Sequence, residues 1–276
     1  MNPAPVVITV GPTGAQATRE NTPYLPLTAE EIAAEVTAAY EAGASVASLH
    51  LRDAEGLPTA DLEIGRRTIA LIQEQSPILV QLSSGVSPTA DLEDRLRLMD
   101  LKPRMATLSL CSMTFGQVEF RNPPDFVRRL AERMQELNIK PELEVYDTGH
   151  VDAALALAAD GLLSAPLQFG IVMGVRGGMA ATHENLLSIV RRLPEDAVWQ
   201  AIAIGRHNFD FAALAMTLGG NARTGLEDNL YLRRGELSPG NVPLVSKMAA
   251  IAAALDRPLA TVEETEAMLK LAPAGQ

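Results

Sequence analysis

The stretch SVASLHLRDAEG, Ser45–Gly56, joins a run of small, aliphatic and β-branched residues to a polar segment that begins at His50. The first half is typical of a strand that is buried on both faces, as parallel strands are. The second half places His50, Arg52 and Asp53 where that strand ends and a loop begins. A hydrophobic strand that ends in polar side chains recurs along the chain, and this recurrence indicates the fold.

Hydrophobic runs of this kind alternate with amphipathic helical stretches about eight times, a pattern typical of a parallel sheet. The predicted strands cover residues 6–10, 45–51, 77–83, 105–110, 141–147, 167–173, 199–205 and 222–228. Helix starts are also visible, because Thr28 and Glu31 have the spacing of a capping box. We therefore predict a (β/α)8 TIM barrel, a single domain over residues 1–276 with an extra helix at its C-terminal end.

The main alternative fold is a doubly wound open sheet. Its dinucleotide fingerprint, GxGxxG, is missing after the first predicted strand, where residues 6–16 read VVITVGPTGAQ. A barrel places its chemistry at the carboxyl ends of its strands, and polar side chains follow nearly every predicted strand here. Buried polar groups are costly unless they are paired, so their convergence at one end favours a barrel with a site there.

The composition excludes several classes of protein. A formal net charge of −11 argues against a nucleic-acid partner or an anionic membrane surface. No apolar run reaches the roughly 18 residues of a membrane span, and the N-terminal residues lack a signal-peptide pattern. The single cysteine, Cys111, cannot form an intrachain disulfide and fits a reducing compartment. We expect a cytoplasmic enzyme that acts on a small molecule.

Strand geometry groups the polar residues, because side chains two apart on a strand point to the same face. The groups that share a face are Ser48, His50 and Arg52 in the second predicted strand, and Glu142, Glu144 and Tyr146 in the fifth. Adjacent residues such as Glu227 and Asp228 cannot both point inward from a regular strand, so we place them where the last strand ends. A guanidinium at Arg223 would keep Asp228 ionised if the two side chains lie close together.

Several blocks at the predicted strand ends occur in the order of a known family. They are TGA, TPYLPLTAEEIA, LHLRD, QLSSG, KPRMATL, PELEVYDTGH, GVRGGM, AIGR and RTGLEDN. With these blocks the chain resembles the β-keto acid cleavage enzymes over nearly its full length. The resemblance implies a (β/α)8 barrel with a divalent metal, usually zinc. It also implies a homo-oligomer and a reaction between a β-keto acid and acetyl-CoA that yields acetoacetate and a new acyl-CoA.

The resemblance also assigns roles to individual residues. His50 and Glu227 match metal ligands that polarise the keto group, and Ser48 stands where the family has its first histidine ligand. Asp228 and Arg223 match an acid–base dyad that removes a proton between the two carbonyl groups. The residues that match or adjoin substrate-binding positions are Ser83, Ser84, Gly85, Thr107, Glu144, which faces the variable tail, and Gln16, where some members have glutamate.

Ser48 leaves the metal site open to three interpretations, because a serine hydroxyl is a poor zinc ligand beside imidazole or carboxylate. The site is weakened, completed by water or by another side chain such as His150 or His207, or lost. If it is lost, the barrel is a small-molecule binding protein.

The loop GVRGGM, residues 174–179, leaves another alternative open, an unrelated phosphate-binding barrel enzyme. That enzyme would need a Schiff-base lysine or a dedicated base at a strand end, whereas Lys102 and Lys140 precede strands. Within the resemblance, the same loop allows close backbone approach to an anionic or CoA group, with Arg176 available for charge.

Overall fold

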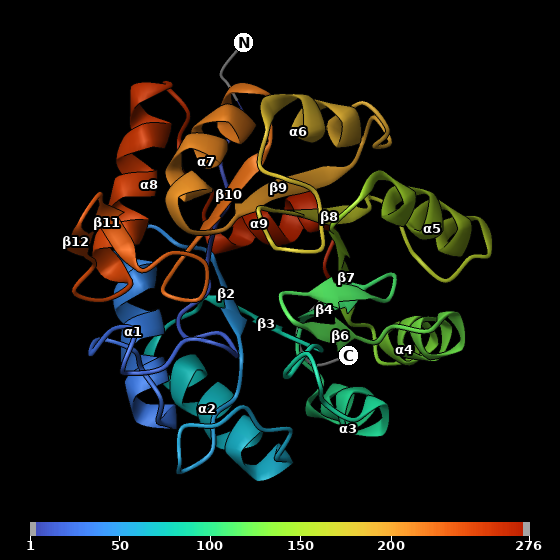
Figure 1. Ribbon diagram of the computed structural model, residues 1–276, viewed down its shortest axis with the longest axis horizontal. Helices are drawn as coiled ribbons and strands as arrows, with labels where there is room; N and C mark the ends of the chain where they lie inside the picture. The colour runs from blue at the N-terminus through green and yellow to red at the C-terminus, as the bar shows by residue number, and fades with distance from the viewer. Residues whose placement is uncertain (1–3, 273–276) are drawn as a thin grey trace.

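A computed structural model describes residues 4–272 and contains a closed barrel of parallel strands ringed by helices (Figure 1). The barrel strands are β1 (Ile8–Val10), β2 (Val46–Leu49), β3 (Leu79–Leu82), β4 (Met105–Ser109), β7 (Lys140–Val145), β8 (Gln168–Met173), β9 (Val198–Ala203) and β10 (Asn221–Thr224). Strand β1 pairs with both β2 and β10, so the sheet closes without an edge. The predicted (β/α)8 fold is confirmed. The ends of the predicted domain range, residues 1–3 and 273–276, lie outside the described residues.

Helices follow the barrel strands and cover the outside of the sheet (Figure 1). They are α1 (Ala29–Glu41), α2 (Leu62–Gln75), α3 (Leu92–Arg97) with η1 (Leu98–Leu101), α4 (Pro124–Glu136), α5 (Thr148–Ala159), α6 (His183–Val190), η2 (Gly205–His207), α7 (Asn208–Thr217), α8 (Val242–Ala254) and α9 (Val262–Leu269). The predicted capping box is present, since the Thr28 side chain accepts from the Glu31 amide and Glu31 accepts from the Thr28 amide. None of the helices within residues 4–272 combines the length and the apolar character needed to cross a membrane.

The amino end of the barrel is closed by α9, the extra helix predicted at the C-terminal end. Leu269 of this helix packs in one cluster with the first residues of three strands, Val46, Leu79 and Met105. This packing seals the amino end, so the open end of the barrel is the carboxyl end of its strands. The fold therefore directs any site to the loops that follow the strands.

A polar layer crosses the barrel interior above this seal. The carboxylate of Glu142 on β7 is fully buried and accepts hydrogen bonds from the side-chain amides of Gln81 on β3 and Gln200 on β9. Burial raises the pKa of Glu142 to about 7, although Arg223 and the two amides act in the opposite direction. The interior thus carries polar groups one layer below the strand ends.

Two features of the fold differ from the sequence prediction. The last barrel strand was expected to continue to residue 228, but β10 ends at Thr224 because Gly225 turns the chain with φ +144°. Two short hairpins were not predicted: β5 (Met113–Phe115) with β6 (Val118–Phe120), and β11 (Tyr231–Arg233) with β12 (Glu236–Leu237). Both extend loops at the carboxyl ends of strands, where they build the rim of the barrel.

Candidate active site

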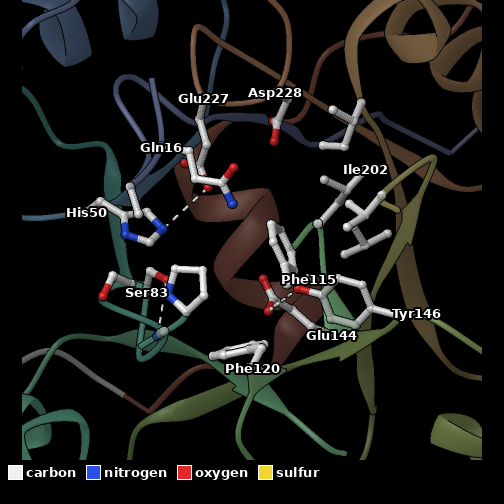
Figure 2. A pocket seen from close by; sticks show the side chains of 18 of the residues that line it. Gln16, His50, Ser83, Phe115, Phe120, Glu144, Tyr146, Ile202, Glu227 and Asp228 are labelled. Carbon is white, nitrogen blue, oxygen red and sulfur yellow. Dashed lines mark hydrogen bonds and ion pairs between the residues drawn. The ribbon is translucent and has the colours of Figure 1, made fainter. Parts of the chain in front are cut away.

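A cavity of about 320 Å³ opens at the carboxyl end of the barrel. Seven of the residues predicted from the sequence line it: Gln16, His50, Ser83, Gly85, Glu144, Glu227 and Asp228. Arg223, the other member of the predicted dyad, lines it as well. Figure 2 shows Glu227 and Asp228 on one side of the cavity, with Glu144 and Tyr146 on the other. Side chains that are up to 212 residues apart in sequence, from Gln16 to Asp228, therefore meet in one space.

Arg223 is the centre of the charged cluster at the cavity. This side chain is 4% exposed, and its Nε and Nη2 atoms donate to the two carboxylate oxygens of Asp228 at 2.9 and 3.2 Å. Nη2 also lies 2.6 Å from Glu227 Oε1, and Nη1 donates to Ser48 Oγ at 3.2 Å. A bidentate guanidinium–carboxylate pair fixes direction as well as charge. Asp228 is therefore held in one orientation.

Burial and the mutual charges of Arg223, Glu227 and Asp228 shift the pKa of each of these side chains. Burial alone would lower the pKa of Arg223, but the carboxylates of Asp228 and Glu227 leave it well above its usual value. Burial raises the pKa of Asp228 to about 6, against the opposing pull of Arg223. For Glu227, burial acts to raise the pKa, but the charges and hydrogen bonds of Arg223 and His50 together outweigh it and lower the pKa to about 2. Near neutral pH, Asp228 is an ionised carboxylate with a higher proton affinity than an ordinary aspartate.

Glu227 also faces His50 across the cavity. His50 Nδ1 lies 3.0 Å from the carbonyl oxygen of Val86, and because a carbonyl only accepts, Nδ1 carries a proton. His50 Nε2 is then the atom that faces Glu227 Oε1, at 3.4 Å (Figure 2). The other carboxylate oxygen, Glu227 Oε2, is buried and has no hydrogen-bond partner among the described residues.

Backbone contacts hold the turn that carries Glu227 and Asp228. The Glu227 amide donates to the Gly11 carbonyl at 3.1 Å, and the Gly205 amide donates to the Asp228 carbonyl at 2.7 Å. A Cβ at Gly14 would lie 2.5 Å from Glu227 Cγ, so this position in the TGA block requires glycine. Gly225 likewise approaches Gly11 closely, since its Cβ would lie 2.1 Å from the Gly11 carbonyl oxygen. The turn is therefore fixed by the loop after β1.

Comparison with known proteins identifies the family. The family model described as beta-keto acid cleavage enzyme matches residues 5–271. The chain belongs to this family. It is 37% identical over 268 residues to the 3-keto-5-aminohexanoate cleavage enzyme of Fusobacterium nucleatum, covering 96% of this chain and 98% of the relative. It is 36% identical over 271 residues to the 3-oxoadipate:acetyl-CoA acetyltransferase of Cupriavidus necator, covering 97% and 95%.

Solved structures support the fold of this family member. A ternary complex of ObcA with a C4-CoA adduct and oxalate superposes with a TM-score of 0.79 at 21% identity, over 90% of this chain and 68% of ObcA. At this identity the likeness concerns the fold alone. The resemblance seen in the sequence is confirmed at the level of the family, and the chain is an enzyme of the β-keto acid cleavage type.

Three predicted site residues of this β-keto acid cleavage enzyme do not line the cavity. Thr107 is buried and accepts a hydrogen bond from the Ser84 amide at 3.0 Å, so both lie beneath the turn that presents Ser83 and Gly85. Ser48 is fully buried next to Arg223. The strand pattern places these residues correctly at the carboxyl end of the barrel, but it cannot distinguish the cavity surface from the layer below it.

The residues do not fit the metal centre that the family resemblance implies. The hydroxyl of Ser48 is bonded to Arg223, which leaves two protein donors, His50 and Glu227, where catalytic zinc sites have three. Within residues 4–272 no group of three His, Cys, Asp or Glu side chains is arranged to hold a metal ion. His150 and His207 do not complete the set, since neither lines the cavity that contains His50 and Glu227.

The wall opposite Asp228 combines the predicted Glu144 with two residues that were not predicted, Phe115 and Phe120. Glu144 accepts from Ser109 Oγ at 2.8 Å and from the Tyr146 hydroxyl at 3.1 Å. The Phe115 ring makes edge contacts with the rings of Phe120 and Tyr146, each with 6.2 Å between centroids. Phe115 and Phe120 come from the β5–β6 hairpin, whose sequence signal is an alternating pattern around Gly116. The carboxylate of Glu144 thus shares this wall of the cavity with three aromatic rings.

Arg52 and Asp53, which follow β2, support loops instead of lining the cavity. Arg52 is buried and donates to the carbonyl oxygens of Gly14 and Ala17, and so braces the loop after β1. Asp53 accepts from the amides of Glu55 and Leu57 within its own loop. Among the polar residues that follow β2, His50 therefore lines the site, whereas Arg52 and Asp53 stabilise the neighbouring loops.

Proposed function

We propose that this β-keto acid cleavage enzyme transfers acyl groups between a β-keto acid and acetyl-CoA, releasing acetoacetate and a new acyl-CoA. The observation that carries the proposal is the buried pair of Arg223 and Asp228 at the cavity, with Nε to Oδ2 at 2.9 Å. Relatives named 3-oxoadipate:acetyl-CoA acetyltransferase and 3,5-dioxohexanoate:acetyl-CoA acetone transferase support acetyl-CoA as the second substrate.

In the first step, Asp228 removes a proton from the carbon between the keto group and the carboxylate. A base works best when its pKa lies close to the working pH, and burial raises the pKa of Asp228 to about 6. Negative charge then develops on the keto oxygen, where fixed positive groups and donors stabilise it. Arg223 lines the cavity and has five N–H groups, of which four are bonded to Asp228, Glu227 and Ser48. The remaining Nη1 N–H is a donor for that oxygen.

In the later steps one carbon–carbon bond forms and another breaks. The enolate carbon attacks the thioester carbonyl of acetyl-CoA, a new carbon–carbon bond forms, and CoA leaves as a thiolate. The thiolate attacks the original keto carbon, and the bond between that carbon and the enolate carbon breaks. The products are an acyl-CoA that keeps the tail of the keto acid and the enolate of acetoacetate, to which Asp228 returns its proton. No step passes through a metal, because the donor set lacks a third ligand.

We infer that the wall around Glu144 receives the tail of the keto acid. A carboxylate that lines the cavity together with the rings of Phe115, Phe120 and Tyr146 favours a cationic tail, through charge and cation–π attraction, or a tail with a hydroxyl donor. We assign the carboxylate end to Ser83, which lines the cavity on the side of His50 (Figure 2). Ser84 and Thr107 contribute by supporting the turn that presents Ser83.

The same proposal includes a homo-oligomeric, cytoplasmic enzyme, supported by the family and by the single cysteine. It is tested with a panel of β-keto acids that carry cationic, hydroxylated, neutral or anionic tails, each mixed with acetyl-CoA and purified protein. Mass spectrometry of the CoA products is expected to find new acyl-CoA species, formed fastest from the cationic or hydroxylated tails. Formation of no acyl-CoA from any member of the panel would contradict the proposed reaction.

A further inference from the structure

Two arginines at the rim of the barrel have no carboxylate partner among the described residues. Most arginines on the outer helices are paired with carboxylates, for example Arg128 with Asp160 at 2.7 Å. Arg176, in the loop after β8, and Arg206, in η2 after β9, are both exposed, and neither forms an ion pair with any described residue. In a protein with a formal charge of −11, two arginines without carboxylate partners at the mouth of a cavity indicate a site for an anion.

Arg176 belongs to a loop with a preset conformation. It lines the cavity, and its carbonyl oxygen accepts from the Gly116 amide at 2.9 Å. The next residue, Gly177, has φ +103°, and a Cβ there would lie 1.9 Å from the carbonyl oxygen of Thr114. The GVRGGM loop is therefore packed on the β5–β6 hairpin by a contact that only glycine allows. Its arginine is presented to the cavity without a large loss of loop entropy on binding.

Arg206 lies next to this loop. A Cβ at Gly174 would be 3.9 Å from a ring carbon of His207, and Arg206 Nε donates to His207 Nε2 at 3.1 Å. The nearest acidic residues along the two loops are Glu184 and Asp210, both exposed in the first turns of α6 and α7. Glu184 is engaged by its own amide and by Thr182. Arg176, which lines the cavity, and Arg206, on the neighbouring loop, thus form a positively charged edge at the rim of the barrel.

An apolar wall connects this edge with the reacting groups. Val172 and Ile202 form a buried cluster with Tyr146, and Val175 and Ile204 pack against it. The four aliphatic residues of this wall, Val172, Val175, Ile202 and Ile204, all line the cavity. Figure 2 shows Ile202 across the cavity from His50. A ligand that reaches Asp228 along this wall therefore has an apolar stretch inside and a positive edge outside.

Acetyl-CoA matches this arrangement of an apolar wall and a positive edge. Its thioester lies at one end of a long pantetheine arm, and its phosphates lie at the other end. A cavity of about 320 Å³ has room for the keto acid and the thioester, so the phosphates must lie at the rim. We propose that Arg176 and Arg206 bind the phosphate groups of the CoA co-substrate, with the pantetheine arm along Val172, Ile202 and Ile204. This inference rests on the proposed function and adds the position of its second substrate.

The test compares acetyl-CoA with acetyl-pantetheine, a thioester donor that lacks phosphates. The variants are Arg176→Gln, Arg206→Gln and the double variant. Arg191→Gln is the matched control, because Arg191 is exposed and has no ion pair among the described residues but lies at the opposite end of α6. We expect each rim variant to raise the KM for acetyl-CoA by roughly tenfold, in line with the loss of a charge-assisted hydrogen bond. The KM for the keto acid and the rate with acetyl-pantetheine should stay at wild-type values.

Two outcomes overturn the inference. If the variants lose as much activity with acetyl-pantetheine as with acetyl-CoA, the arginines support the chemistry or the fold and not the phosphates. If neither donor is affected, the phosphates bind elsewhere. Calorimetric titration of free CoA separates this inference from the proposed reaction, because it needs no turnover. Tight CoA binding that weakens in Arg176→Gln supports the phosphate site even without catalysis, whereas a wild-type protein that binds no CoA contradicts it.

Discussion

Replacing Asp228 by asparagine should lower turnover by about 10² to 10⁴-fold without destabilising the fold. The buried cluster contains one guanidinium, Arg223, and two carboxylates, Glu227 and Asp228, so it carries an excess negative charge. Asparagine removes that excess and keeps the size of the side chain. Arg223 retains Glu227 Oε1 at 2.6 Å and is not left as an unpaired buried charge. The substitution therefore differs from the removal of one partner of an isolated buried pair.

The expected magnitudes follow from two separate effects. Loss of a general base typically lowers the rate by about 10² to 10⁴-fold. The rise in the pKa of Asp228 from 3.8 to about 6 means that the folded state disfavours the ionised carboxyl by up to about 3 kcal/mol. This cost is present above the folded pKa and disappears below the unfolded one, so stability falls as pH rises between them. At pH 8 the variant should unfold with a free energy at least equal to that of the wild type.

Three measurements check this prediction. Turnover is followed as acyl-CoA formation, and urea unfolding gives the free energy of unfolding at pH 8. Deuterium exchange at the carbon between the two carbonyls of the keto acid, with acetyl-CoA absent, isolates the proton-removal step. Asp160→Asn is the control, since this exposed aspartate pairs with Arg128 far from the cavity. A variant that keeps turnover or exchange within tenfold of the wild type, or that loses several kcal/mol of stability, would refute the reasoning.

Further predictions concern the metal ligands and the barrel interior. Ser48→His should restore a third zinc ligand beside His50 and Glu227, so elemental analysis after dialysis should find about one zinc per chain in the variant and much less in the wild type. Stoichiometric zinc in the wild type would contradict our interpretation of Ser48. Glu142→Gln should stabilise the protein by up to about 3 kcal/mol at pH 8 and little near pH 4.5, because a pKa raised from 4.5 to about 7 makes the ionised form costly above pH 7. Urea unfolding of both proteins across this range tests it, and a variant that keeps the wild-type pH dependence would refute it.

Sequence reasoning located the barrel strands because each is a short hydrophobic run followed by polar residues. The predicted strand at 167–173 and the observed β8, Gln168–Met173, agree within one residue. The last strand was predicted too long, because the run ARTGLED contains no residue whose side chain excludes a strand. Its end is set by Gly225, whose close approach to Gly11 comes from another part of the chain. The end of a strand cannot be predicted from the local sequence pattern when a tertiary contact determines it.

The site was predictable at the level of strand ends but not at the level of individual contacts. His50, Glu144, Glu227 and Asp228 were found because polar residues at strand ends converge in a barrel and because the motifs match the family. The bond between Ser48 and Arg223 spans 175 residues and depends on the register of the closed sheet. The aromatic wall was missed for a different reason. Its two phenylalanines lie on a short hairpin whose strands are only three residues each, too brief for a clear periodic signal.

The central claim is that a β-keto acid and acetyl-CoA exchange carbon units at Asp228. The most direct measurement supplies acetyl-CoA labelled with carbon-13 in both acetyl carbons and analyses both products by NMR and mass spectrometry. The mechanism predicts acetoacetate labelled in its methyl and keto carbons, with an unlabelled carboxyl half, and an acyl-CoA that carries no label. Label in the new acyl-CoA, or acetoacetate free of label, would contradict the account.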